Sequence, residues 1–335
     1  MAGEAIGGNI MTVILGSGEH RYRVEEGWGQ LPDGWSFHEV GAVGVDRNDN
    51  VYVFNRGEHP MIVFSRDGQF LRSWGEGLFP RAHGVHMAPD DTIFCTDDGA
   101  HCVRKCTLEG RVLMTLGTPG KPAPFMSGQP FCRCTHTALS PKGEIYVSDG
   151  YGNAQVHKYS PDGRYLSSWG RCGVGEGEFN LPHNIHCDAD GWVYVADREN
   201  SRVQVFDGNG RFETAWNNVV HRPSAMHFSG GACPLCFIGE VGPYLGSNRG
   251  FPNLGPRISI LSPTGKLLAR LGSETNPHGQ APGQFMSPHG LAVDSHGDIY
   301  VGEVSVASWP SLFPGQPRPE RLRSLQKLVK VGAET

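Results

Sequence analysis

The sequence has no long apolar run and no excess of basic residues. None of its hydrophobic stretches approaches the ~18 residues of a membrane-spanning helix. Its 29 Lys and Arg residues are outnumbered by 34 Asp and Glu residues, which gives a net charge of −5. Nucleic acids and anionic membrane surfaces are bound by basic faces, so the composition argues against both as partners.

Signals for export and for several common enzyme classes are also missing. Residues 1–9 are Gly-rich and acidic and contain neither a basic stretch nor an apolar core, so the sequence predicts no signal peptide. Without such a signal, we expect the nine cysteines to be reduced and the protein to be cytoplasmic. There is no HExxH zinc motif, no Walker loop and no GxSxG nucleophile elbow.

Glycine and proline, by contrast, are abundant. The 47 Gly and 24 Pro residues make up 71 of the 335 residues and divide the chain into many short segments. With 19% charged and 38% hydrophobic residues, the composition is that of a packed globular protein. Short segments separated by turn residues at this density favour an all-β architecture.

An internal repeat organises the chain. Residues 181–197 and 287–303 share a Pro-His pair, an apolar run, a turn with Gly and a strand that contains Tyr-Val. The same frame recurs, in places loosely, at residues 40–55, 81–97, 134–149 and 224–240. Each frame predicts two strands joined by a tight turn. After each of the first five frames, two further strands are predicted around a turn such as Asp-Gly or Asn-Gly.

The last unit ends with a third strand at Leu325–Val331 and has no fourth strand. His20–Trp28 has the features of a fourth strand with nothing before it. If this amino-terminal strand completes the carboxy-terminal blade, both irregularities are explained and the ring has no exposed sheet edge. The sequence therefore predicts an all-β, six-bladed β-propeller over residues 20–331, with an extension (1–19) and a tail (332–335).

The residue that opens the first strand of each unit is a candidate for chemistry. Aligned on the second strand, units two, four and six have His83, His183 and His289 at this position, whereas units one and three have Gly and Thr. Alternate blades of a six-fold ring lie a third of a turn apart, so the imidazoles would approach the central channel from three sides. Three protein ligands with an open fourth position are typical of catalytic zinc. The sequence thus predicts a Zn²⁺ site. The alternative is that Pro-His belongs only to the repeat and that each His bonds to a neighbouring blade.

Five further residues are expected in the strands and loops around the predicted channel. His86 and His186 lie three residues further along their strands and are expected to face the packing between blades. His136, next to the opening position of unit three, is a further candidate for the cavity. Tyr151 and Arg56 follow second strands, in loops that surround one end of a propeller channel. Their alternative role is ordinary turn chemistry, since Asp-Gly-Tyr-Gly-Asn is also a good turn sequence.

These patterns also carry a resemblance. The repeat Pro-His-Gly…Asp…Gly-x-Ile-Tyr-Val resembles the NHL repeat over residues 20–331. Within that group the chain most resembles the catalytic core of peptidyl-α-hydroxyglycine α-amidating lyase. The matching stretches are Asn55–His59, Ala82–Gly84, Ser148–Asn153, Pro182-His183 with Ala196–Asn200, and Pro288–Gly290.

The resemblance implies roles for particular residues. In the lyase, the Tyr that matches Tyr151 accepts a proton over the zinc, and the Arg that matches Arg56 helps that Tyr to ionise. The chain also departs from the lyase at two informative positions. Gly152 stands where the lyase has a disulfide cysteine, so that bridge is not expected. Gly290 stands where the lyase has a carboxylate that supplies a calcium ligand, which argues against calcium.

The expected function is therefore a zinc-dependent lyase. It would act on a small molecule with a carbinolamide group, R–CO–NH–CH(OH)–R′, and break the C–N bond to give an amide and an aldehyde such as glyoxylate. Tyr151 would remove the hydroxyl proton, with His136 as the next candidate base. Two alternatives stay open. One is a metal-dependent hydrolase such as a lactonase, although those sites resemble a Glu/Asn/Asp shell that three histidines do not supply. The other is a non-catalytic NHL binding module.

Overall fold

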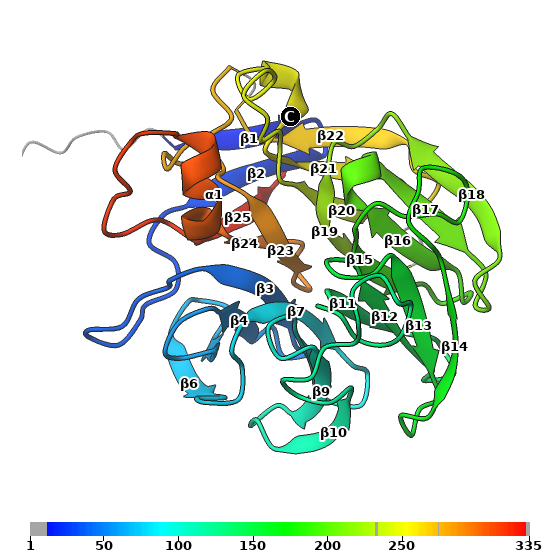
Figure 1. Ribbon diagram of the computed structural model, residues 1–335. Helices are drawn as coiled ribbons and strands as arrows, with labels where there is room; N and C mark the ends of the chain where they lie inside the picture. Colours follow the sequence, from blue (N-terminus) through cyan, green and yellow to red (C-terminus); the bar gives the residue numbers. More distant parts are fainter. Residues whose placement is uncertain (1–11, 232–233, 274, 333–335) are drawn as a thin grey trace, which may run out of the picture.

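Six antiparallel β-sheets surround a common axis and form the blades of a propeller (Figure 1). The structure is a computed structural model that describes residues 12–231, 234–273 and 275–332. In blades one to five, four strands follow one another in chain order from the axis outward. The innermost strands β3, β7, β11, β15, β19 and β23 pack against one another around the axis. The predicted all-β, six-bladed propeller is confirmed.

The elements have the following bounds. Blades one to three contain β3 (Val40–Val45), β4 (Val51–Asn55), β5 (Met61–Phe64), β6 (Phe70–Trp74), β7 (Ala82–Met87), β8 (Thr92–Asp97), β9 (Cys102–Thr107), β10 (Val112–Leu116), β11 (His136–Leu139), β12 (Ile145–Asp149), β13 (Gln155–Tyr159) and β14 (Tyr165–Trp169). Blades four and five contain β15 (Pro182–Cys187), β16 (Val193–Asp197), β17 (Arg202–Phe206), β18 (Phe212–Asn217), β19 (Pro223–Phe228), β20 (Cys236–Glu240), β21 (Arg257–Leu261) and β22 (Leu267–Leu271). Blade six contains β23 (Pro288–Val293), β24 (Ile299–Glu303), β25 (Leu325–Val331), β2 (His20–Glu25) and β1 (Ile14–Ser17). The short helices are η1 (Arg198–Asn200), η2 (Pro252–Leu254) and α1 (Ser305–Leu312).

Blade six is closed by the amino-terminal part of the chain. Strand β2 pairs antiparallel with β25, and Val24 lies opposite Leu328. This confirms that the amino-terminal strand completes the last blade. A fifth strand, β1, pairs with β2 on the outside. It lies within the segment 1–19, for which the sequence analysis expected an extension and no strand.

Contacts between neighbouring blades explain why Gly and Trp recur in the repeat. Gly210 has a φ of +86°, and a Cβ added there would lie 2.4 Å from the indole of Trp169 in the preceding blade. The same contact joins blade six to blade one, where a Cβ at Gly68 would lie 3.1 Å from the Trp28 indole. A side chain at either turn would push the blades apart, so glycine serves both the turn conformation and the packing.

A buried polar side chain ends the second strand of every blade. These residues are Asn55, Asp97, Asp149, Asp197, Glu240 and Glu303. Each accepts a hydrogen bond, with N···O between 2.5 and 3.1 Å, from a backbone N–H in the segment that enters the innermost strand of its own blade. Buried N–H groups outside the sheet ladder need such acceptors. The six side chains therefore set where each innermost strand begins.

Two insertions pack together on the face of the propeller where second strands end. One is residues 242–256 in blade five, and the other contains α1 in blade six (Figure 1). Trp309 and Leu312 of α1 are buried with Met286 and are packed against Tyr244 of the first insertion. Helix α1 was not predicted from the sequence.

No helix in the described part of the chain is long and apolar enough to cross a membrane. The eight cysteines within the described residues are all free thiols, while Cys233 lies outside them.

Deleting residues 1–26 should destabilise the propeller, because it removes β1 and β2 and exposes the edge of β25. We expect the midpoint of thermal unfolding to fall by roughly 5 °C or more and aggregation to increase. Differential scanning calorimetry and light scattering measure both. A deletion of residues 1–11, which removes neither strand, is the control. Equal melting of the two truncated proteins would contradict closure by β2.

Candidate metal centre

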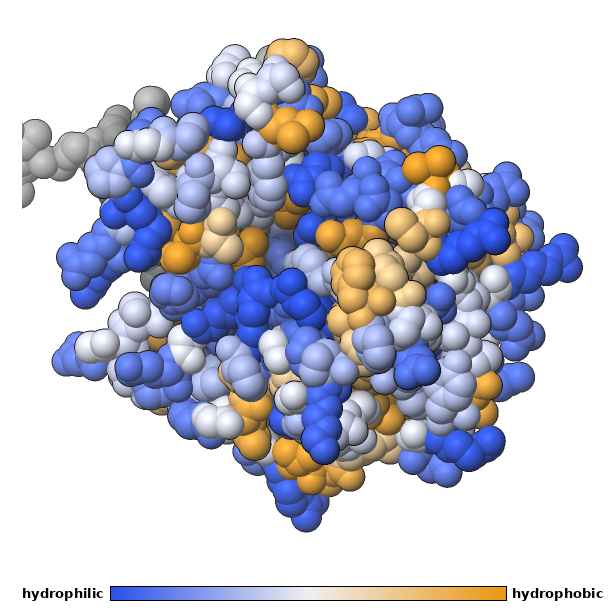
Figure 2. Space-filling model, viewed as in Figure 1, coloured by the Kyte–Doolittle hydropathy of each residue, from blue (hydrophilic) through white to orange (hydrophobic). Residues whose placement is uncertain are grey.

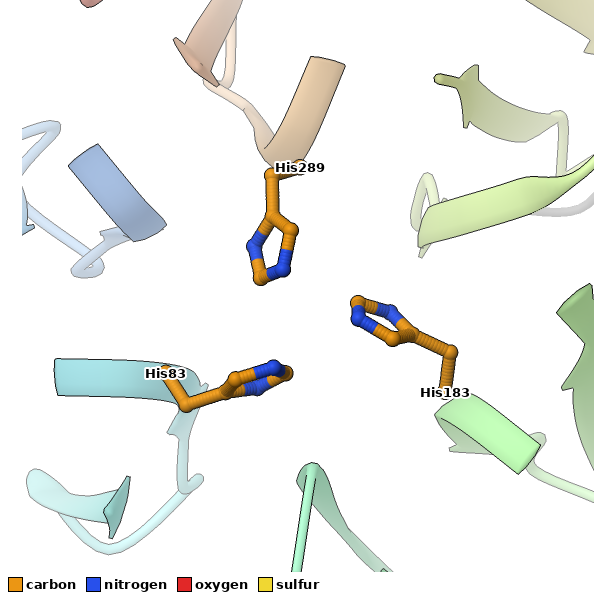
Figure 3. A group of neighbouring side chains, drawn as sticks. All are labelled: His83, His183 and His289. Carbon is orange, nitrogen blue, oxygen red and sulfur yellow. The ribbon is translucent and has the colours of Figure 1, made fainter. Parts of the chain in front are cut away.

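Three histidines from alternate blades meet on the axis of the propeller. His83, His183 and His289 are each the second residue of an innermost strand, in β7, β15 and β23. Their side chains are buried, and one nitrogen of each ring lies within 4.8 Å of the others. Figure 3 shows the three rings pointing toward one another from three sides. The structure thus brings together the three residues that the repeat alignment singled out.

A hydrogen bond to the neighbouring blade orients each imidazole. The three Nδ1 atoms donate to the main-chain oxygens of Thr135, Ser224 and Gly41, each at 2.7 Å. In blades three, five and one, these acceptors occupy the place that His occupies in the other blades. Because a carbonyl can only accept, Nδ1 must carry the proton and Nε2 keeps its lone pair for a metal.

The surroundings keep the three rings neutral. Burial lowers the pKa of all three imidazoles well below the usual 6.5, and the guanidinium groups of Arg56 and Arg198 act in the same direction. Three neutral nitrogen donors in a buried, pre-oriented group suit a borderline metal ion such as zinc better than a hard cation such as calcium. The group can therefore hold a metal ion.

Tyr151 lies on the mouth side of the three histidines. Its hydroxyl is 3.1 Å from Nε2 of His83 and 3.1 Å from Nε2 of His183. Its ring is flanked by two cations, since the guanidinium carbon of Arg133 is 4.5 Å and that of Arg198 is 5.5 Å from the ring centroid. Arg198 also donates to the Tyr151 hydroxyl at 3.4 Å. The phenol ring thus lies against two guanidinium groups.

Arg56 is held beside the centre by two contacts. Its Nε donates to the carbonyl of Ala82 at 2.8 Å, and its Nη1 pairs with the buried carboxylate of Glu39 at 3.2 Å. Nη2 is buried and has no hydrogen-bond partner among the described residues. Arg56 acts electrostatically on His83 and His289. The cations in contact with Tyr151 are instead Arg198 and Arg133.

His136 lies deeper in the molecule than Tyr151. It lines a small cavity, which it shares with the three axial histidines and with residues such as Asn184 and Leu291 that follow them along the innermost strands. Burial lowers the pKa of His136 to about 4, and its Nδ1 has no hydrogen-bond partner among the described residues. His136 therefore stands behind the centre, on the side away from the mouth.

His86 and His186 do not join the axial group. The only cluster of metal-ligating side chains found within the described residues consists of the other three histidines. The ring of His186 stacks on Phe228 at 4.3 Å between centroids. Both residues thus lie apart from the candidate metal position.

Four residues around the mouth were not assigned a role from the sequence. Arg198 follows the second strand of blade four, just as Arg56 follows that of blade one, so loop position and the matching stretch Ala196–Asn200 could have indicated it. Arg133, Asp98 and Glu39 lie in loops outside the repeat frame, and no sequence signal marked them.

Comparisons with known proteins agree with this fold. The NHL repeat model matches residues 179–206. Human NHL repeat-containing protein 3 is 35% identical over 62% of this chain and 64% of its own length. Peptidyl-alpha-hydroxyglycine alpha-amidating lyase 1 of Drosophila melanogaster is 30% identical over 71% of this chain and 45% of its own length. The matched part therefore spans less than two thirds of either relative.

A solved structure supports the architecture alone. A gluconolactonase from Xanthomonas campestris superimposes with a TM-score of 0.58 at 10% identity, covering 93% of this chain and 91% of that chain. Together with the repeat match and the relatives named as amidating lyases, this confirms the resemblance to an NHL-repeat, six-bladed propeller of the amidating-lyase type.

Replacing any one axial histidine should remove the bound metal. We expect His83→Ala, His183→Ala and His289→Ala to lose nearly all metal from protein purified without chelators, because two ligands hold it too weakly. His86→Ala and His186→Ala should retain it. Elemental analysis by mass spectrometry gives the metal per chain for all five. Equal loss in all five variants would contradict the assignment of the ligands.

The role of the hydrogen bonds from Nδ1 to the backbone carbonyls can be tested with a substitution that displaces one of these carbonyls. A Cβ at Gly84 would lie 2.5 Å from the Thr135 oxygen that holds His83. Gly84→Ala should therefore displace this acceptor and weaken metal affinity about 10–100-fold, the typical cost of losing an outer-shell partner. Competition with a chromophoric chelator measures the affinity. Gly250→Ala, where a Cβ meets nothing within 4 Å, is the control. Unchanged affinity in Gly84→Ala would argue against this role of the carbonyl.

Proposed function

We propose that this protein is a zinc-dependent lyase that breaks the C–N bond of a small α-hydroxy-amide. The observation that carries the proposal is the convergence of three Nε2 atoms with the Tyr151 hydroxyl directly against two of them. The fly relative named as an amidating lyase supports the same reaction class. The products would be a primary amide and an aldehyde, which is glyoxylate when the substrate is an N-acyl-α-hydroxyglycine.

His83, His183 and His289 would hold the zinc through Nε2. When bound there, zinc would supply Lewis acidity that polarises the substrate hydroxyl or its neighbouring carboxylate. The Nδ1–carbonyl bonds contribute by keeping the donor atoms in place before the metal and substrate arrive, so that less reorganisation is needed.

Tyr151 would act as the proton-accepting group. As a phenolate it takes the proton of the substrate hydroxyl, and the O–H electron pair forms the new C=O bond. The C–N bond then breaks, its electron pair goes to nitrogen, and the proton moves from Tyr151 to that nitrogen. The step neither consumes water nor changes any oxidation state. Arg133 and Arg198 support this role because both guanidinium groups lie against the Tyr151 ring.

The positive groups near Tyr151 would also bind the carboxylate of the substrate. Arg56 offers Nη2, which is buried and lacks a hydrogen-bond partner among the described residues. Leaving a buried guanidinium N–H unpaired costs free energy, so an anionic ligand that accepts from it is strongly favoured. Arg198, which donates to the Tyr151 hydroxyl, would supply a second positive group. Both would hold the reacting carbon close to Tyr151.

Tyr151→Phe should abolish most of the activity and leave the zinc in place. The substitution keeps the ring between its two arginines but removes the group that accepts the proton. We expect kcat for release of glyoxylate from an N-acyl-α-hydroxyglycine to fall by about 10²–10⁴, the usual contribution of a general base. Tyr165→Phe is the matched control, because Tyr165 is 46% exposed on the outermost strand of the same blade.

The outcomes separate the parts of the proposal. A Tyr151→Phe protein with bound zinc and full activity would remove Tyr151 from the mechanism and make His136 the next base to test. Wild-type protein that binds zinc but releases no glyoxylate would contradict this substrate class. Wild-type protein that binds no metal would favour the alternative of a binding module.

A further inference from the structure

Two arginines at the mouth share one buried carboxylate. Nη1 of Arg81 contacts Oδ2 of Asp98 at 2.5 Å, and Nη2 and Nε of Arg133 contact the same oxygen at 2.7 and 3.1 Å. The Asp98 side chain is fully buried, whereas those of Arg81 and Arg133 are 38% and 40% exposed. The cluster therefore has two positive charges and one negative charge, and the guanidinium groups are its exposed part.

Neighbouring acidic residues do not balance this excess. The adjacent carboxylate of Asp97 accepts backbone N–H groups of Arg81 and Ala100 and faces the guanidinium of Arg104. All salt bridges made by Arg81 and Arg133 within the described residues end on Asp98. Arg56 differs, because its single positive charge is matched by Glu39.

Arg133 is also held rigidly against the proposed reaction centre. Its backbone has a φ of +65°, in the left-handed region that non-Gly residues seldom occupy. Its N–H donates to Nδ1 of His101 at 3.1 Å, which stabilises this conformation. Its guanidinium lies over the ring of Tyr151 at 4.5 Å. A ligand bound to the exposed side of Arg133 would thus lie within a short carbon chain of the Tyr151 hydroxyl.

We propose that Arg81 and Arg133 form a second anion subsite that takes a carboxylate group of the substrate remote from the reacting carbon. The substrate of the proposed lyase would then be a dianion, with one carboxylate near Arg56 and Arg198 and the other on the pair held by Asp98. This assignment rests on the proposed function for the first carboxylate, but the subsite itself does not depend on catalysis.

The chemistry of the pair suits a carboxylate. A guanidinium presents planar, paired donors that match two carboxylate oxygens, and each charge-assisted bond is stronger than a neutral one. Asp98 fixes both side chains from the buried side, so little side-chain freedom is lost when a ligand binds. The mouth also concentrates positive charge in a protein whose net charge is −5, which draws anions to this face. In Figure 2, strongly hydrophilic residues border the hollow at the centre of the face that carries α1.

The test compares dicarboxylates with monocarboxylates of equal chain length. Isothermal titration calorimetry on the full chain, with zinc content measured, gives Kd for oxalate through adipate and for acetate through hexanoate. We expect at least one dicarboxylate to bind about tenfold or more tightly than its monocarboxylate partner. In Arg133→Gln and Arg81→Gln this preference should fall about tenfold, because one charge-assisted hydrogen bond to the second carboxylate is lost. The affinity for monocarboxylates should change little.

Arg171→Gln is the matched control. Arg171 lies in a loop on the same face, pairs with Glu178 and is 80% exposed, so the variant makes the same charge change away from Asp98. It should keep the full preference for the dicarboxylate. Arg133→Lys should keep only part of it, since the charge stays but the planar donors are lost. Circular dichroism and zinc content confirm that each variant is folded and equally loaded.

Three results would overturn the subsite. One is equal affinity for dicarboxylates and monocarboxylates at every chain length. The second is an unchanged preference in Arg133→Gln. The third is an equal loss of preference in Arg171→Gln, which would reflect only the overall charge. Because these are binding measurements, a dicarboxylate preference without lyase activity supports the subsite and contradicts the reaction. Lyase activity without that preference supports the reaction and contradicts the subsite.

Discussion

The buried polar side chain at the end of each second strand is the constraint on which the site depends. In all six blades it accepts a backbone N–H from the segment that leads into the innermost strand. That hydrogen bond sets where the innermost strand begins relative to its neighbour. In blades two, four and six, His83, His183 and His289 follow the donor residue by two or three positions. The same bond that starts a strand therefore also places an imidazole on the axis.

The centre is a product of the whole ring and not of three blades. Even-numbered blades contribute the imidazoles, while odd-numbered blades contribute the carbonyls that receive Nδ1. This requires the innermost strands to approach very closely, as at Gly41, where a Cβ would lie only 2.5 Å from the Ala82 oxygen. Closure by β2 keeps all six strands at that spacing. Fold stability and metal geometry are thus coupled through the same backbone contacts.

The chemistry of the mouth is carried by loops that the repeat does not specify. Arg133 and Arg198, from blades three and four, lie against Tyr151, whereas the insertions of blades five and six form an apolar cluster around Trp309. Propellers with very different activities share this architecture, so such loops help to set the reaction, together with the three histidines of the innermost strands.

The sequence alone determined the parts that repeat. The repeat predicts the strand order, the ring closure and the alternation of His83, His183 and His289 with Gly and Thr. It does so because each blade buries the same pattern of side chains against its neighbours. Tyr151 and Arg56 were found because they follow second strands. Strand β1 was missed because Ile14–Ser17 lies outside the repeat and pairs only with the strand that closes the ring.

Only the tertiary structure showed how the side chains are used. The carbonyl partners of Nδ1 are main-chain atoms, which any residue could supply, so no sequence pattern marks them. The pairing of Arg133 with Asp98, and of Arg56 with Glu39, joins loops that lie far apart along the chain. Loop side chains have no periodicity, and their directions are decided by contacts with other blades. That is why the three axial histidines could be singled out from the sequence, while the cations around them required the fold.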